Sequence, residues 1–198
     1  MPTPIMSRLK YLALPAAFCV PGAASAYTQD TFFALWQEYQ QFCGRMLANP
    51  IAFHDNPAAQ IGASGDVEHS FTQDRSGQDY ILTTPSQTPG YERLYQMSSY
   101  RVSDVMEQSC VVADVPATGP GAHNIQTLAA GIQAVFASSP GFDITGGAYV
   151  VPSLSDLNPD DQLFTVTGAF QGQMIMTLIT ISEYEIFLEH THLSSVAP

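Results

Sequence analysis

Positive charge is almost absent from this chain of 198 residues. Lys and Arg together number six against 18 Asp and Glu, and the formal net charge is −12. A surface so poor in cations cannot hold a phosphate backbone through a basic patch, which excludes the usual nucleic-acid-binding classes. Long apolar runs are missing as well, which excludes a polytopic membrane protein and predicts no stable membrane insertion.

Charged residues of both signs are scarce, at 12% of the chain, whereas 45% of the residues are apolar and 11% are aromatic. A disordered chain has the opposite balance. The composition therefore predicts a compact acidic domain with a sizeable core. Its excess of carboxylates favours cations, basic partner proteins or a salty environment, and the simpler alternative is a solvated acidic surface.

The first 26 residues have the pattern of a signal peptide. Arg8 and Lys10 precede an apolar stretch over residues 11–20, and a small-x-small site ends at Ala26. We expect cleavage between Ala26 and Tyr27. This predicts a periplasmic or secreted protein whose mature chain has no lysine and a formal charge of −14.

Two cysteines remain after this cleavage, Cys43 and Cys110. In an exported protein an even pair of cysteines is most simply one disulfide. The sequence has no CxxC motif, so it supports neither a thioredoxin-like site nor a zinc–cysteine knuckle. Cys43 falls in an expected helix and Cys110 in an expected strand, so the bond would fix that helix to the sheet.

Apolar periodicity predicts an α+β fold with an antiparallel sheet and two amphipathic helices on one of its faces. Apolar residues spaced three and four apart predict helices over 28–47 and from Ile125 to Phe136. Residues 50–66 are expected to form a loop. Alternation and turn residues predict eight strands in two groups of four. The expected strands are 67–73, 78–84, 91–102, 106–115, 142–151, 162–170, 173–181 and 184–192.

The order of these elements suggests a tandem αββββ organisation. We expect one domain over 27–198, within which 27–115 and 122–192 are candidate sub-units. In outline the order resembles that of cystatin-like modules and of tandem β-lactamase-inhibitor-type modules, although the chain carries no motif of either family.

A pair of histidines near the C-terminus is a candidate metal site. His190 and His192 lie two residues apart on an expected strand, so both rings would point to one side. His54 with Asp55, or His69, would then complete the ligand set. The alternative is that the pair are polar residues at the end of a core-facing strand.

The first group of strands carries a candidate binding surface. Tyr80, Tyr91, Tyr95 and Tyr100 all fall within it, and tyrosines are frequent at protein interfaces. Ordinary cross-strand packing would explain them equally well. The segment 174–181 is apolar on both faces, which predicts a central strand that is covered on both sides or faces a partner, and leaves an oligomer open.

No set of residues in the chain forms a coherent catalytic motif. The sequence therefore predicts an exported, non-catalytic binding or interaction module, stabilised by one disulfide, with no cofactor and with an unknown protein or small ligand as partner. One alternative is a metal-dependent or acid/base hydrolase that uses His190 and His192. The other is a carrier of a small apolar ligand, held in a cavity between helix and sheet.

Overall fold

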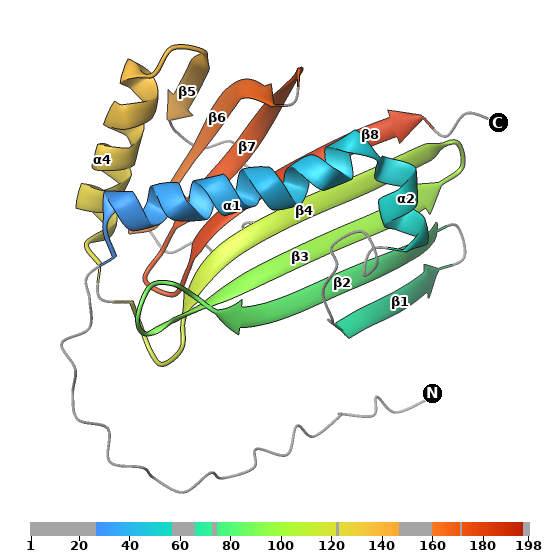
Figure 1. Cartoon of the computed structure of the whole chain (residues 1–198), viewed down its shortest axis with the longest axis horizontal. Coiled ribbons are helices and arrows are strands. Elements are labelled where there is room, and N and C mark those ends of the chain that lie inside the picture. Colours follow the sequence, from blue (N-terminus) through green and yellow to red (C-terminus); the bar gives the residue numbers. More distant parts are fainter. Residues whose placement is uncertain are drawn as a thin grey trace, which may run out of the picture.

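The fold is α+β, as predicted: one antiparallel sheet carries helices on one face (Figure 1). A computed structural model describes residues 27–56, 66–72, 75–121, 123–146, 160–170 and 172–195. The expected signal peptide lies outside these ranges. The helices are α1 (Gln29–Ala48), α2 (Pro50–Asp55) and α4 (Ile125–Ser138). The strands are β1 (Asp66–Thr72), β2 (Arg75–Pro85), β3 (Tyr91–Val102), β4 (Val105–Pro116), β5 (Phe142–Gly146), β6 (Gln162–Phe170), β7 (Gln173–Ile181) and β8 (Ile186–Ser195).

The eight described strands follow the order β1-β2-β3-β4-β8-β7-β6-β5. Each group of four is a meander, and the two groups join along β4 and β8, where Cys110 lies opposite His190. The second group runs outward from this antiparallel pair in the same strand order as the first. The tandem αββββ organisation predicted from the sequence is thus the organisation of the sheet.

Helix α1 packs across the junction of the two groups (Figure 1). Thr28 caps the N-terminus of α1, and its side chain accepts a hydrogen bond from the backbone N–H of Thr31. Its apolar stripe is buried against the sheet. The predicted disulfide is confirmed: Cys43 and Cys110 are joined by an S–S bond of 2.03 Å, which fixes α1 to β4.

The expected loop after α1 was wrong in part, because residues 50–55 form the short helix α2. Asn49 is the C-cap residue of α1, and Pro50 follows it. They also begin the next helix: the Asn49 side chain accepts from the backbone N–H of Ala52 at 3.2 Å, and proline suits the first helical position. The side chain of Gln108 in β4 donates to the Pro50 carbonyl at 2.6 Å, so α2 lies on the same face as α1.

The first hairpin is tighter than expected. The expected strands 67–73 and 78–84 leave residues 74–77 for the turn, but Arg75 already pairs with Thr72. The reason lies in the neighbouring strand: β3 is long enough for Ser76 to pair with Arg101. Ladder bonds on both sides thus extend β2 towards its start.

In the second group, two strands have one end that differs from the predicted bounds. The described part of β5 ends at Gly146, and the remainder of the expected strand lies outside the described residues. Strand β8 begins at Ile186 instead of Tyr184. The Ser182 hydroxyl accepts from the backbone N–H groups of Tyr184 and Glu185, which holds both residues in the turn.

Helix α4 closes the helix side of the second group with aromatic side chains. Phe136 lies edge-on against Trp36 of α1 and Phe142 of β5, with ring centroids 4.9 and 5.3 Å apart. Phe142 in turn lies over Gly168, where a Cβ atom would come within 2.5 Å of its ring. Burial of a large apolar side chain such as Phe136 contributes about 1.5–3 kcal/mol to the stability of the fold.

Candidate functional site

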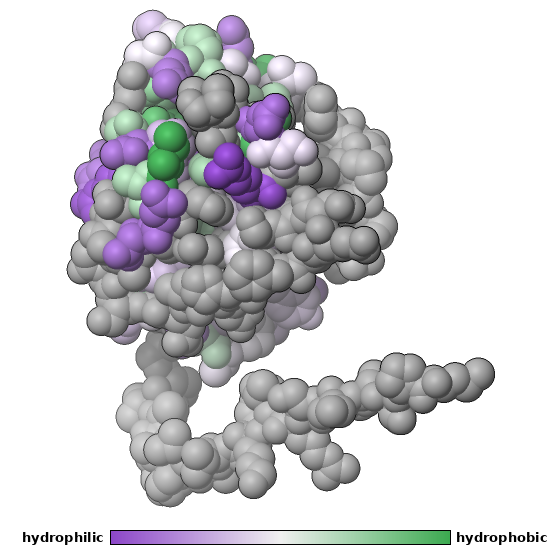
Figure 2. Space-filling model, turned by 90° about the vertical axis from the view of Figure 1, so that its right-hand side faces the viewer, coloured by the Kyte–Doolittle hydropathy of each residue, from purple (hydrophilic) through white to green (hydrophobic). Residues whose placement is uncertain are grey.

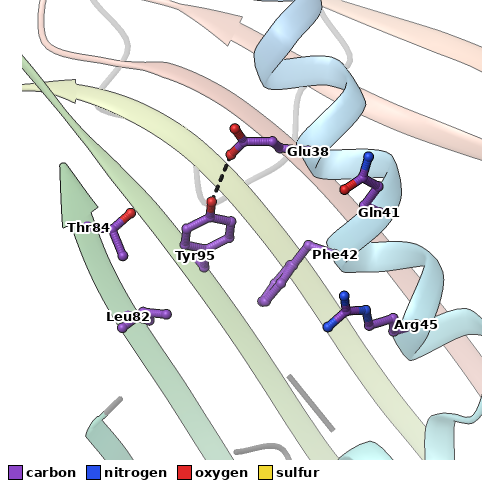
Figure 3. A pocket seen from close by; sticks show the side chains of 7 residues that line it. All are labelled: Glu38, Gln41, Phe42, Arg45, Leu82, Thr84 and Tyr95. Carbon is purple, nitrogen blue, oxygen red and sulfur yellow. Dashed lines mark hydrogen bonds between the residues drawn. The ribbon is translucent and has the colours of Figure 1, made fainter. Parts of the chain in front are cut away.

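A groove of about 390 Å³ lies between α1 and the strands β2 and β3 (Figure 3). A volume of this size is in the range of small-molecule sites. One wall comes from α1 and the other from the two strands. The lining residues are Glu38, Gln41, Phe42, Arg45, Leu82, Thr84 and Tyr95.

The middle of the groove is apolar and aromatic. Phe42 points from α1 towards the strands, and its ring lies 5.0 Å from that of Tyr95, at an angle of 52° (Figure 3). Leu82 of β2 continues this surface. Aromatic faces attract both apolar groups and cations.

A buried ion pair supports one end of the groove. Arg93 and Asp114 are 2% and 0% exposed, and both lie on core-facing positions of adjacent strands. The guanidinium donates to both oxygens of the carboxylate, from Nε at 2.6 Å and from Nη2 at 3.0 Å. The phenol of Tyr27 donates to the same carboxylate at 2.8 Å. A buried charge is tolerated only when it is paired and hydrogen-bonded in this way.

Glu38 connects this ion pair to the groove. Its Oε2 atom accepts from Nη1 of Arg93 and from the phenol of Tyr95, the latter at 2.7 Å. Burial and the bond to Glu38 raise the pKa of Tyr95 to about 12, so this phenol keeps its proton at neutral pH. One guanidinium is shared by the two carboxylates of Glu38 and Asp114, so the cluster has a formal charge of −1 at the rim of the groove.

The four tyrosines predicted as a binding surface do not share one surface. Tyr80 and Tyr91 are buried in the core. Tyr95 lines the groove. Tyr100 lies on the opposite face of the sheet, where its hydroxyl donates to the carboxylate of Asp79 at 2.7 Å.

Most of the candidate metal ligands have side chains outside the described residues. His190 faces the helices and is buried, with Nδ1 3.1 Å from the carbonyl of Met176. The side chains of His54, His69 and His192 are outside the described residues, and Asp55 is exposed. Among the described side chains, no group of three or more His, Cys, Asp or Glu could hold a metal ion.

The sequence analysis missed the charged residues behind the groove. Glu38 belongs to α1, whereas Arg93 and Asp114 belong to β3 and β4, and no local motif connects them. One signal was available. Arg93 alternates with Tyr91 and Tyr95 on a strand, and a charged residue at a core-facing position needs a buried partner.

Comparison with protein-family models, with curated proteins and with solved structures finds no match for this chain. Its function therefore has to be argued from its own residues. Within the described ranges, no helix is both long and apolar enough to cross a membrane. The disulfide is the kind of bond that forms in an oxidising compartment.

Proposed function

We propose that this protein is an exported, non-catalytic binding module that holds a cationic ligand with an apolar body in the groove between α1, β2 and β3. The observation that carries the proposal is the placement of Glu38. Its carboxylate is fixed by Arg93 and Tyr95 at one end of an aromatic groove, and the cluster around it has an excess negative charge.

The ligand class follows from the order of groups along the groove. Both protein donors bond Oε2 of Glu38, so Oε1 would accept from an ammonium or guanidinium group of the ligand. The apolar body would lie on Phe42, Leu82 and Tyr95. Arg45 lies two turns further along α1, about 10 Å from Glu38 by helical rise, where it would meet an acceptor group of the ligand.

The matched pair of probes is phenylalanine amide, which has an ammonium group and an apolar ring, and its N-acetylated form, which has lost the charge. We expect phenylalanine amide to shift the NMR signals of Leu82 and Tyr95, and acetylation to weaken binding by at least about tenfold. The reason is that a hydrogen bond to a charged group is worth about 1.5–3 kcal/mol.

The matched pair of variants lies on one helix. Glu38→Gln keeps the shape and the acceptor oxygen but removes the charge, and it should weaken binding by about tenfold. Asp30→Asn removes the same charge from an exposed position in the first turn of α1 and should leave binding unchanged. Equal binding of both probes, or equal effects of both variants, would contradict the proposal.

A further inference from the structure

The face of the sheet opposite the helices holds an exposed apolar area on β7. Met174 and Met176 are 65% and 47% exposed, whereas Met46, Met97 and Met106 are at most 2% exposed. The ladder registers identify the face: Ile179 packs in the helix-side core, so the even-numbered residues of β7 point away from the helices.

The same registers place a continuous row of side chains across seven strands of this face. The row consists of Ile81, Gln96, Val111, Glu189, Leu178, Thr165 and Thr145. Leu178 follows Met176 on the same side of β7 and lies directly opposite Glu189 of β8. Val111 of β4 and Thr165 of β6 in this row are only 3% and 7% exposed, so the exposed apolar area lies around Met174 and Met176 and does not continue along the row.

All three described helices lie on the other side of the sheet. Cys43 of α1 bonds to Cys110, α2 accepts from Gln108, and Phe136 of α4 packs against Phe142, and these strand residues all point to the helix side. At the end of the molecule seen in Figure 2, by contrast, the coloured residues are mostly hydrophilic, with only a small hydrophobic patch. Exposed apolar area on one sheet face is the kind of feature that marks an interaction surface.

The charges on this face have one sign. Among the side chains that the structure describes there, the charged ones are carboxylates, and none is Lys or Arg. These residues are Asp79, Glu92, Glu107, Asp143 and Glu189. Asp143 lies opposite Thr167, which lies opposite Met176, so a carboxylate is two strands, about 10 Å, from the exposed methionine.

We infer that this face docks a basic protein, with apolar side chains of that partner on Met174, Met176 and Leu178 and with its lysines or arginines facing the surrounding carboxylates. A second copy of the same chain is the wrong occupant, because two such faces would bring carboxylate against carboxylate. The surface is separate from the proposed groove, which lies on the helix side.

The exposed methionines provide the readout. The probe is a synthetic peptide with alternating Leu and Thr in its centre and two lysines at each end. We expect the peptide to slow peroxide oxidation of Met174 and Met176, without changing that of the buried Met46, Met97 and Met106. The same peptide with glutamates in place of lysines should not bind. This measurement needs no variant, so it does not depend on a substituted protein folding.

Two comparisons of variants then test whether the peptide binds to this face, and not to any exposed charged or apolar side chain. Met174→Ser with Met176→Ser should weaken peptide binding by at least about tenfold, whereas Ile51→Ser, at an exposed position on α2, should not. Glu107→Gln with Glu189→Gln should weaken it similarly, whereas Asp30→Asn with Asp55→Asn, which removes the same charge from exposed helix positions, should change it less than about twofold.

Three results would overturn the inference. The peptide could fail to protect the methionines, the face and control variants could weaken binding alike, or the free protein could sediment as a dimer with both methionines already shielded. Glu38→Gln should leave peptide binding intact. The proposal for the groove and the proposal for this face are therefore tested independently.

Discussion

The two halves of this molecule share an architecture but use their helix sides differently. In the second half, α4 closes the sheet with aromatic rings packed edge to face, and the small hollow beside Trp36 and Phe142 measures only about 10 Å³. In the first half, α1 lies over the junction with β8, and a groove of about 390 Å³ stays open beside β2 and β3.

The difference lies in what each half buries. Among the described residues, both halves bury apolar and some polar side chains, but the buried ion pair of Arg93 and Asp114 belongs to the first half. A buried ion pair is a poor source of stability compared with apolar packing. The pair also holds Glu38 at the groove, because Nη1 of Arg93 donates to its carboxylate.

The largest expected effect comes from breaking the ion pair. Arg93→Met leaves the Asp114 carboxylate buried without its cation and should lower the free energy of unfolding by about 3–5 kcal/mol, measured by urea denaturation. Adding Asp114→Leu should recover part of this loss, because no buried charge then remains in the pair. A double variant as unstable as the single one would mean that packing, not charge, explains the effect.

The second half should respond to the loss of aromatic packing. Phe136→Ala should lower the free energy of unfolding by about 3–5 kcal/mol, because the cavity it leaves is surrounded by rigid aromatic side chains. Leu82→Ala, in the open groove, should cost less than half as much under the same denaturation conditions. Similar losses at the two positions would remove the distinction between a closed half and an open one.

Reduction of the disulfide tests how α1 is held to the first half. Cys43 and Cys110 are 67 residues apart, and the chain-entropy model gives about 4 kcal/mol for such a link, with measured values often lower. Urea denaturation of the Cys43→Ser/Cys110→Ser variant measures the loss. Hydrogen exchange should then accelerate more in β2 and β3 than in β6 and β7, and an even acceleration would contradict this assignment.

Alkaline pH should destabilise mainly the first half. The loss of unfolding free energy should be smaller than in the variants above. The pKa of Tyr95 is raised to about 12 and that of Tyr27 is raised further, by burial and by Asp114, from an ordinary value of 10.0. The native state therefore binds these protons more tightly than the unfolded state. The stabilisation is complete below pH 10 and is lost as the pH rises towards 12 and above.

The free energy of unfolding is measured in steps from pH 9 to pH 12, and its slope against pH reports this loss of stability. Tyr95→Phe and Tyr27→Phe should each make it shallower, because each removes one raised pKa. A slope unchanged in both variants would assign the alkaline loss to other groups.

Local patterns predicted most of the elements and the face that the helices cover, but not which strands join the two groups. The apolar stripe of α1 and the alternation in β3 and β4 are visible in the sequence, and so is the cysteine pair. The pairing of β4 with β8 is not, because residues about 80 positions apart in the chain leave no local signal of contact. For the same reason the sequence identified Tyr95 but grouped it with Tyr80 and Tyr100, instead of with Glu38 on a distant helix.

The seam between the halves is an ordinary antiparallel ladder, with pairs from Val105 opposite Ser195 to Asp114 opposite Ile186. The chain crosses from one half to the other once, between Pro116 and Ile125. Strand β4 would form the same ladder with β8 of its own chain or of another. When the protein refolds at high concentration, two molecules could therefore exchange their second halves. The resulting domain-swapped dimer would keep every native contact within each half.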